Sequence, residues 1–281
     1  MTPRRALLGL HIGALAFGLT GVFGKLALAA PLVIVFGRAL FAVLSLAPFA
    51  RLRAGERRPD ARRLLMLIGA GLLLGGHWLT FFHAVKISGV AIATLGFASF
   101  PAFTVLLEGL LFRERIRAGE WLMLALITLG LVLVTPRFDL ASAATSGLLW
   151  AILSGLLFAL LSLANRATVK GLNPFQAALW QNLTIALCLL PLAWHALPNV
   201  RPLDWLWLAI LGVFCTGIAH SLFVASLSVL KARTAALIFS LEPVYAIGFA
   251  WWLFDEQPTW RMAAGTALIL LAILFSIRQK P

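Results

Sequence analysis

Residues 64–85 read LLMLIGAGLLLGGHWLTFFHAV, a stretch of 22 residues without Asp, Glu, Lys or Arg. A helix needs about 20 mostly apolar residues to cross the hydrocarbon core of a bilayer. A basic segment, from Arg51 to Arg63, lies immediately before this stretch. The pattern therefore predicts a membrane-spanning helix that begins on the side of the membrane where the basic segment lies.

The composition of the whole chain indicates a lipid surrounding. Hydrophobic residues make up 62% and charged residues only 12% of the 281 residues, whereas soluble domains are close to half apolar and a quarter charged. So few charged side chains cannot cover the core of a soluble protein of this size. The net charge of +13 would suit nucleic acid, but the basic residues fall between apolar runs. That placement favours membrane lipid, and not nucleic acid, as the partner.

The same length criterion, applied outward from residues 64–85, predicts an all-α integral membrane protein. Backbone groups in hydrocarbon must pair within the chain, so each continuous apolar run is expected to be a helix. Ten such helices are predicted, near residues 6–28, 32–50, 64–85, 88–112, 119–135, 147–168, 174–194, 205–229, 233–254 and 259–277.

The basic residues predict how these helices are oriented. With the N-terminus inside, the outer connections hold only Lys86, Arg137, Arg201 and Arg261, and the other side holds most of the Lys and Arg. Basic residues accumulate in cytoplasmic loops. We therefore expect both termini in the cytoplasm and the protein in the inner (plasma) membrane of a bacterial-type cell.

The two halves of the chain resemble each other at an offset of about 142 residues. Leu95, Phe97, Pro101, Phe112 and Glu114 match Leu237, Phe239, Pro243, Phe254 and Glu256, and at nearby offsets Lys25 matches Arg166, Pro31 matches Pro174 and His77 matches His220. Five helices per half is an odd number, so the second half must enter the membrane from the opposite side. Inverted repeats of this kind are typical of secondary transporters. We predict two repeats, 1–140 and 141–281, around a central cavity.

Two short segments carry a resemblance to a known family. Ser240-Leu241-Glu242-Pro243-Val244, then Phe254-Asp255-Glu256-Gln257-Pro258 and Gly265, look like the end of an EamA domain, and Ser99-Phe100-Pro101-Ala102 with Phe112-Arg113-Glu114-Arg115 look like the same element in the first half. The chain resembles the EamA branch of the drug/metabolite transporter superfamily over nearly its full length.

This resemblance implies a basket-like fold in which helices one to four and six to nine surround the cavity while the fifth and tenth are peripheral. It implies export or exchange of small metabolites, and YddG-like exporters of aromatic and other neutral amino acids are similar in general character. The small multidrug members couple protons through a glutamate in their first helix. The predicted helix 6–28 has no carboxylate, so this route of coupling is not expected.

Ionisable residues inside membrane spans are costly and are therefore candidates for function. Glu242 is expected near the middle of the predicted helix 233–254, beside Pro243, which loosens a helix and frees backbone carbonyls. The alternative is a structural carboxylate paired with a neighbouring helix. Arg38, about two turns inside its helix, is equally suited to grip a substrate carboxylate and to be a fixed partner of another helix.

Five further residues are predicted to bind substrate. His77 and His220 lie at mirrored depths, where imidazole can bind substrate or relay protons, or can simply bond to an adjacent helix. Trp78 adjoins His77, and Trp180 adjoins Gln181, which with Asn182 lies near the counterpart of Arg38 in the repeat. Aromatic walls suit apolar metabolites, and ring faces can hold ammonium groups.

Other charged residues are weaker candidates. Glu108 lies close to the cytoplasmic end of its helix, where its side chain can reach water, and Lys25 and Arg166 are expected to anchor helix ends. Cys188 and Cys215 are both in apolar runs and predict neither a disulfide framework nor a metal motif. No cofactor is expected.

We therefore predict a secondary transporter, not an enzyme, that moves small organic metabolites by alternating access and exports aromatic or other neutral amino acids. The peripheral helices offer a surface for a homodimer. Two alternatives stay open at this point. One is an intramembrane enzyme, suggested by the His and Glu content, and the other is a transporter of amine or drug-like cations.

Overall fold

The computed structural model of the protein describes residues 2–52, 59–113, 115–134, 142–168, 172–239 and 241–278. Within these ranges all regular structure is helical. The predicted all-α fold class is therefore confirmed for the described residues. Several predictions lie partly or wholly outside them, namely most of the basic segment after Arg51, Glu114 and the boundary between residues 140 and 141.

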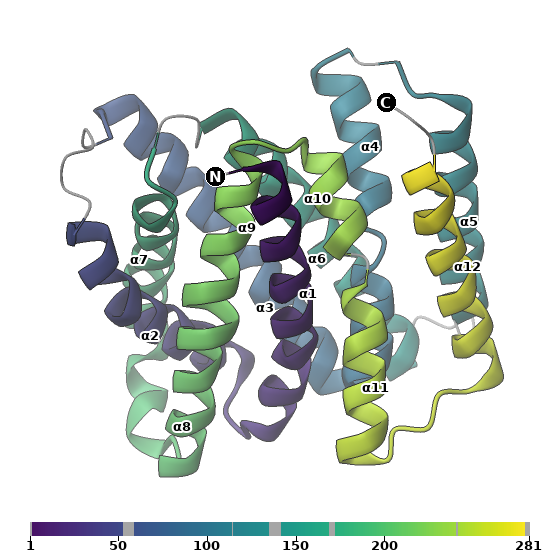
Figure 1. Cartoon of the computed structure of the whole chain (residues 1–281). Helices are drawn as coiled ribbons and strands as arrows, with labels where there is room; N and C mark the ends of the chain where they lie inside the picture. The colour runs from purple at the N-terminus through teal and green to yellow at the C-terminus, as the bar shows by residue number, and fades with distance from the viewer. Residues whose placement is uncertain are drawn as a thin grey trace.

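The helices follow one another along the chain as Figure 1 shows. They are α1 Pro3–Leu26, α2 Pro31–Leu52, α3 Ala61–Phe97, α4 Phe100–Leu111, α5 Ala118–Val134, α6 Ala143–Thr168, α7 Pro174–Ala193, the 3₁₀ helix Trp194–Asn199, α8 Pro202–Ile210, the π-helix η2 Leu211–Ile218, α9 Ala219–Leu227, α10 Ala232–Phe239, α11 Glu242–Phe254 and α12 Trp260–Arg278.

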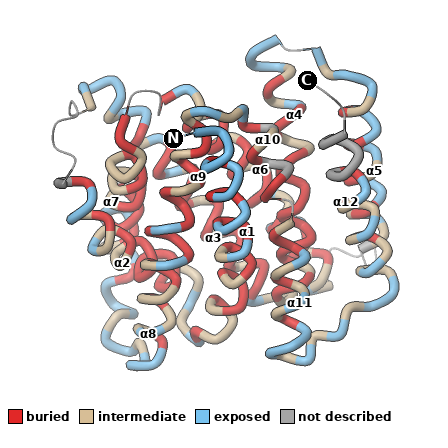
Figure 2. The backbone as a smooth tube through the Cα atoms, viewed as in Figure 1, coloured by how far each residue is buried: buried red, intermediate tan, exposed pale blue. Residues whose placement is uncertain are grey.

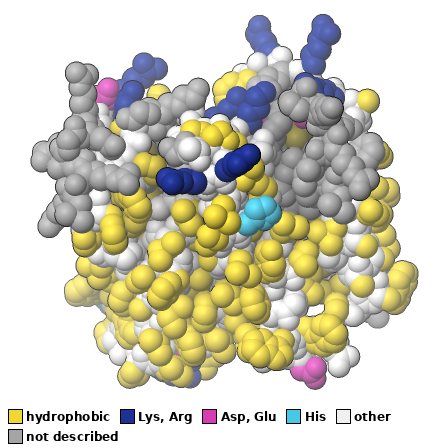
Figure 3. Space-filling model, viewed as in Figure 1, with side chains coloured by type: hydrophobic (Ala, Val, Ile, Leu, Met, Phe, Trp, Pro, Cys, Tyr) yellow, Lys and Arg dark blue, Asp and Glu magenta, His cyan; other side chains and the backbone are white. Residues whose placement is uncertain are grey.

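Six of the described helical segments are long and apolar enough to cross a membrane. They are Pro3–Leu26, Pro31–Ala50, Ala61–Phe97, Ala143–Thr168, Pro174–Asn199 and Pro202–Leu227. Shorter apolar helices cover Phe100–Leu111, Ala118–Leu133 and Trp260–Ala272. Figure 2 shows buried residues along the inner faces of the helices, and Figure 3 shows a broad hydrophobic surface. The count of ten spans stays a prediction.

Two of the predicted helices are each divided. The segment predicted as one helix over 88–112 forms the last part of α3 and all of α4. The part within α3 begins after Gly89, whose φ of +84° is non-helical, and α3 ends at Phe97 before α4 begins at Phe100. The segment 233–254 forms α10 and α11. Pro101 and Pro243 each lie in the first turn of the following helix. Proline has no backbone donor, which suits this position and disfavours a continuous helix through it.

The predicted helix 205–229 differs in another way. It is continuous, but its middle, η2, is a π-helix of 8 residues between α8 and α9. Such segments widen the helix locally and are frequent at functional sites. Apolar pattern and length do not distinguish α from π geometry, so the π-helix could not be predicted.

Both ends of the described chain lie on one side of the molecule. In Figure 1, α1 begins and α12 ends at the upper end, and in Figure 3 Lys and Arg side chains gather along the same end in this view. An even number of crossings would produce this arrangement. The assignment of this end to the cytoplasm stays a prediction.

Two helices lie apart from the rest. Figure 1 shows α5 and α12 beside each other at one edge. They approach closely, because a Cβ atom on Gly130 would lie 2.9 Å from the carbonyl oxygen of Gly265. Small residues permit such close contact between membrane helices. This is the peripheral position that the family resemblance implied for the fifth and tenth helices, while their use in a homodimer stays a prediction.

The centre of the molecule is formed by α3 and α6, which pack along much of their length. Gly96 of α3 has no room for a larger side chain, since an added Cβ would lie 2.6 Å from the Cβ of Ala151. A continuous buried core extends from this contact to α1, α2, α7 and α9. This packing brings polar side chains of five helices, α1, α2, α3, α9 and α11, to one place.

Candidate substrate site

A small central cavity collects most of the predicted site residues. Its lining comes from α1, α2, α3, α6, α9 and α11 and consists of Phe17, Thr20, Arg38, Leu74, His77, Trp78, Phe81, Phe97, Phe158, His220 and Glu242. The volume of this cavity is about 20 Å³. This volume holds about one water molecule, so a small organic metabolite does not fit in the described state.

Arg38 is fully buried and is held by the π-helix. Its Nε and Nη2 atoms donate to Thr216 Oγ1 at 3.0 and 2.8 Å. Thr216 in turn donates to the carbonyl oxygen of Leu211, five residues earlier, at 2.8 Å. The third guanidinium nitrogen, Nη1, is buried without a hydrogen-bond partner among the described residues. A buried, unsatisfied donor on a cation calls for an acceptor.

Aromatic rings enclose the same guanidinium. Its central carbon lies 3.8 Å from the ring centroid of Trp78 and 5.4 Å from that of Phe82. Both distances are within the range of cation–π attraction. The stack fixes the plane of the guanidinium while Thr216 fixes its edge, so Arg38 presents a preorganised positive group to the cavity.

Glu242 faces Arg38 across the cavity lining. It is the first residue of α11, has 4% of its surface exposed, and interacts electrostatically with Arg38. The prediction that Glu242 lies in the middle of a continuous helix was wrong, because α10 ends at Phe239 and α11 begins at Glu242. A carboxylate at a helix N-terminus is favoured by the helix dipole. Broken helices at a buried site are a feature of inverted-repeat transporters.

His77 is anchored to the neighbouring helix α6. Its Nδ1 donates to Ser154 Oγ at 2.7 Å, because that hydroxyl already donates to the backbone carbonyl of His77 at 3.0 Å. The ring also lies among phenylalanines, with centroids 5.0 Å from Phe97 and 4.8 Å from Phe158. In this arrangement Nε2 is the nitrogen that carries the acceptor lone pair.

His220 is held by a different chain of contacts. Its Nε2 donates to Gln181 Oε1 at 2.9 Å, and Gln181 Nε2 donates to Asn165 Oδ1 at 2.5 Å. The other ring nitrogen, Nδ1, is buried without a hydrogen-bond partner among the described residues. Gln181 therefore orients a residue of the lining and does not itself line the cavity.

Phenylalanine rings in contact with one another form much of the remaining lining and the layer directly behind it. Phe158 lies 5.3 Å from Phe97 and 5.2 Å from Phe223, and Phe17 lies 5.1 Å from Phe239, measured between ring centroids. Edge-to-face and offset contacts of this kind add to the stability of an apolar wall. The site thus combines one cation, one carboxyl group and two imidazoles with an aromatic interior.

Not every predicted residue lies here. Trp180 is half-buried, packs against the main core and is outside the cavity lining. Sequence reasoning also missed Thr216, Ser154 and Asn165, which position the charged and imidazole groups. Isolated hydroxyl and amide groups in apolar runs were the only available sign of them.

Glu108 differs from its sequence-based interpretation. It was expected to extend toward water at the end of its helix, but its side chain is fully buried, and Arg166 Nη1 donates to its Oε1 at 2.5 Å.

The described residues contain no group of three or more His, Cys, Asp or Glu side chains that could hold a metal ion.

The fold and the cavity together define a polytopic helical membrane protein with a buried amphoteric site. Residues 4–135 and 145–278 each match the EamA-like transporter family. The chain belongs to this family, and its two matches are two copies of one domain. The predicted membership is thereby confirmed.

Three similar proteins illustrate the breadth of the likeness. The uncharacterized transporter YxxF of Bacillus subtilis (strain 168) is 25% identical over 280 residues, which cover 95% of this chain and 89% of YxxF. An S-adenosylmethionine uptake transporter of Rickettsia prowazekii (strain Madrid E) is 25% identical over 248 residues, or 87% and 82% of the two chains. A crystal structure of a protein that is 21% identical superimposes with a TM-score of 0.72 and covers 96% of this chain and 95% of its own. This last likeness concerns the fold alone.

Proposed function

We propose that the protein is a secondary transporter of small zwitterionic metabolites, and that it exports aromatic or other neutral amino acids across the inner membrane by alternating access. One observation carries the substrate class. The cavity lining places a buried guanidinium with a free donor, Arg38 Nη1, together with a buried carboxyl group, Glu242, inside an aromatic enclosure. A zwitterion with an apolar side chain is complementary to all three.

The binding arrangement follows from the chemistry of each group. The substrate carboxylate accepts from Arg38, which Trp78 and Thr216 hold rigid. The substrate ammonium donates to Glu242. The side chain of the substrate lies among the rings that include Phe97 and Phe158, where ring faces favour apolar and aromatic groups.

Transport requires the helices around the cavity to separate. The cavity as it stands has room for about one water molecule, and an amino acid is several times larger. Binding therefore belongs to states opened toward one side. Alternation between two such states around a fixed central site is how inverted-repeat transporters work.

A second candidate substrate is a cationic amino-acid derivative. The relative from Rickettsia prowazekii is named for uptake of S-adenosylmethionine, which carries an amino-acid group and an additional positive charge. The same Arg38 and Glu242 pair would hold its amino-acid end. This candidate differs from the first in charge and in the direction of transport. An intramembrane enzyme is disfavoured by membership in a transporter family.

Counterflow in proteoliposomes tests the proposal. Vesicles loaded with unlabelled phenylalanine would receive labelled phenylalanine, with phenethylamine, phenylpropionate and S-adenosylmethionine as competitors. We expect phenylalanine to exchange and the two half-molecules, each lacking one charge, to compete at least about tenfold more weakly, because each leaves a buried charge unpaired. Glu242→Gln should remove the advantage over phenylpropionate.

The alternatives predict other outcomes. Phenethylamine competing as well as phenylalanine would support an amine transporter and contradict the zwitterion. Preference for S-adenosylmethionine would support the second candidate. Wild-type exchange and pH profile in Glu242→Gln would remove Glu242 from the site. Efflux from preloaded cells then tests the direction.

A further inference from the structure

A charged cluster lies beyond the cavity at the end of the molecule where α1 finishes. Lys25, in the last turn of α1, forms an ion pair with Glu256, which follows α11. The Lys25 ammonium also lies 4.4 Å from the ring centroid of Phe254. We call Lys25, Phe254 and Glu256 the outer cluster, because the basic-residue pattern assigns this end to the outer side.

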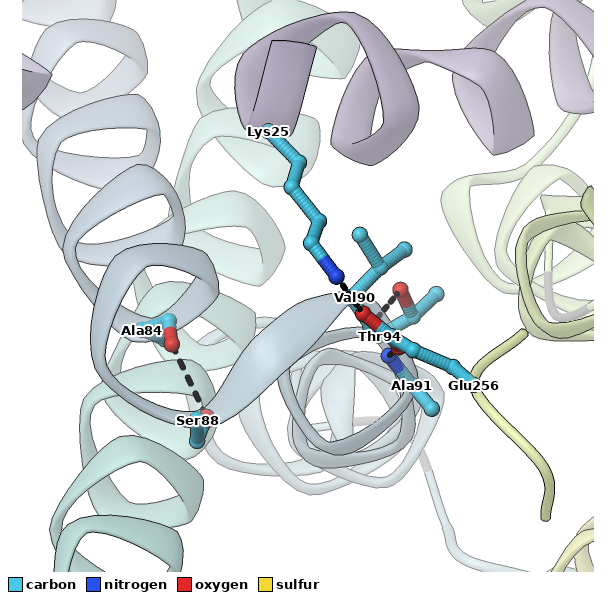
Figure 4. A network of polar contacts seen from close by, with 7 residues as sticks. All are labelled: Lys25, Ala84, Ser88, Val90, Ala91, Thr94 and Glu256. Carbon is cyan, nitrogen blue, oxygen red and sulfur yellow. Dashed lines mark hydrogen bonds and ion pairs between the residues drawn. The ribbon is translucent and has the colours of Figure 1, made fainter. Parts of the chain in front are cut away.

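The outer cluster is tied to the break in α3, as Figure 4 shows. Glu256 Oε2 accepts from the backbone N–H of Ala91, at 3.3 Å, just after the non-helical Gly89. The carboxylate thus lies at the N-terminal end of the helical segment that leads back to the cavity, where backbone donors favour an anion. A Cβ atom on Gly89 would lie 3.3 Å from Glu256 Oε1. Glu256 therefore joins α1, the middle of α3 and the end of α11.

A second cluster of the same composition lies at the opposite end. Arg166, in the last turn of α6, pairs with Glu108 of α4 at 2.5 Å, and its guanidinium carbon lies 5.3 Å from the ring centroid of Phe112. We call Glu108, Phe112 and Arg166 the inner cluster. Each cluster contains a cation, a carboxylate and a phenylalanine.

The two clusters bracket the cavity along the helices that line it. Thr20 lines the cavity on α1, and Lys25 lies five residues further toward the end of that helix. On α6, Phe158 lines the cavity and Arg166 lies eight residues further along. In both clusters, a helix from one sequence half is paired with a residue from the other half.

We propose that the outer and inner clusters are the two gates of the transporter, each closing one end of the central cavity. The proposal rests on the transport function proposed above but not on the identity of the substrate. Opening one end separates the two halves there and must break the local cation–carboxylate pair. Both pairs are intact in the described state, whose cavity has room for about one water molecule.

The chemistry suits a gate. The free energy of the separated cation and carboxylate is only slightly higher than that of the pair once both are hydrated, because water solvates both groups. The closed state gains the ion pair and the ring contact together. Breaking one pair at a time keeps the other end closed, which is the requirement for alternating access.

A cysteine accessibility experiment tests both gates without any substrate. Thr20→Cys in a background with Cys188→Ser and Cys215→Ala serves as reporter, since Thr20 lines the cavity, Cys188 is exposed and the Cys215 thiol lies close to Thr20. A membrane-impermeant methanethiosulfonate is applied to intact cells or to inside-out vesicles. The parent with Thr20 unchanged has no cysteine and measures background labelling.

The expected shifts have opposite directions. Glu256→Gln should raise the rate of labelling from outside by about fivefold and should not raise the rate from inside. Glu108→Gln should raise the rate from inside by about tenfold, because its pair is more deeply buried. Asp255→Asn and Arg115→Gln, which change exposed charges next to the two clusters, should leave both rates unchanged.

A second variant of each pair guards against misfolding. Lys25→Gln and Arg166→Gln remove the other partner, so they should reproduce the directions of Glu256→Gln and Glu108→Gln. Unchanged rates in the well-folded variants, or a rise on the wrong side, would overturn the gates. Changes in labelling rate in the expected directions, without amino-acid exchange, would reject the proposed substrate and support the gates. Amino-acid exchange without these changes in labelling rate would support the substrate and reject the gates.

Discussion

The outer and inner clusters contain the same chemical groups in different surroundings. In the outer pair the side chains of Lys25 and Glu256 are 37% and 20% exposed, whereas in the inner pair those of Arg166 and Glu108 are 23% and 0% exposed. Exposed ion pairs contribute little to stability, and removing one partner of a buried pair is costly. The difference teaches that two ends built from the same chemical groups need not be held equally firmly.

The carboxylates also belong to different elements. Glu108 is within a helix, while Glu256 follows the left-handed residue Asp255 that ends α11. Glu256 can therefore move with a short connection, and Glu108 can move only with its helix. We expect the outer end to open more readily than the inner end.

The largest expected effect comes from breaking the inner pair. Arg166→Leu removes the ion pair, with an N–O distance of 2.5 Å, from the fully buried Glu108, and we expect a loss of about 3 to 5 kcal/mol in stability. Thermal unfolding in detergent measures it, with the exposed Arg115→Leu as control. Adding Glu108→Leu should recover most of the loss, since a buried pair can be replaced by apolar residues. A loss equal to that of the control would contradict the importance of this pair.

The backbone beneath the outer pair is expected to be the next most sensitive. Gly89→Ala forces a side chain onto a φ of +84° and against Glu256 Oε1, so we expect a loss of about 1 to 3 kcal/mol. Gly69→Ala, elsewhere in α3, has no atom within 4 Å of its Cβ and should be neutral or stabilising by about 0.5 to 1 kcal/mol. Equal melting temperatures for the two variants would argue against strain at Gly89.

Breaking the outer pair should lower stability less than either Arg166→Leu or Gly89→Ala. Lys25→Gln removes a partly exposed ion pair and a cation–π contact, each worth about 1 kcal/mol or less at such sites. The melting temperature should therefore change much less than in Arg166→Leu. A loss as large as that of Arg166→Leu would remove the contrast between the two ends.

Salt should produce the smallest effect. Raising KCl from about 0.1 to 1 M shortens the screening length from about 10 to 3 Å, which weakens exposed charge pairs more than buried ones. In the reporter protein with Thr20→Cys and both clusters unchanged, the rate of labelling from outside should rise by about threefold or less. The rate of labelling from inside should not change. Equal sensitivity at both ends would mean that the two pairs are equally hydrated.

Much of the fold could be predicted from the sequence, because membrane insertion depends on the local length and hydrophobicity of each segment. The length of an apolar run decides whether a helix can span the bilayer, and the described helices occupy the predicted runs. The two EamA domains also follow from sequence alone. The helix breaks before Phe100 and Glu242 were not predicted, because hydropathy is insensitive to a local change in backbone direction.

The site was only partly readable. The fold brings the predicted residues Arg38, His77, Trp78, His220 and Glu242 to one cavity, and their role in binding stays a prediction. Trp180 has the same local context as Trp78 but lies outside the lining. Which face of a helix meets the cavity is set by packing against other helices.

The sequence by itself determined that this chain is a helical membrane transporter with costly charges in its spans. Only the tertiary structure decided their partners: Thr216 for Arg38, Gln181 for His220, and Glu256, 231 residues away, for Lys25. The physical reason is that hydrophobicity acts residue by residue along the chain, whereas a buried charge is satisfied by whichever group the packed helices bring within about 3 Å.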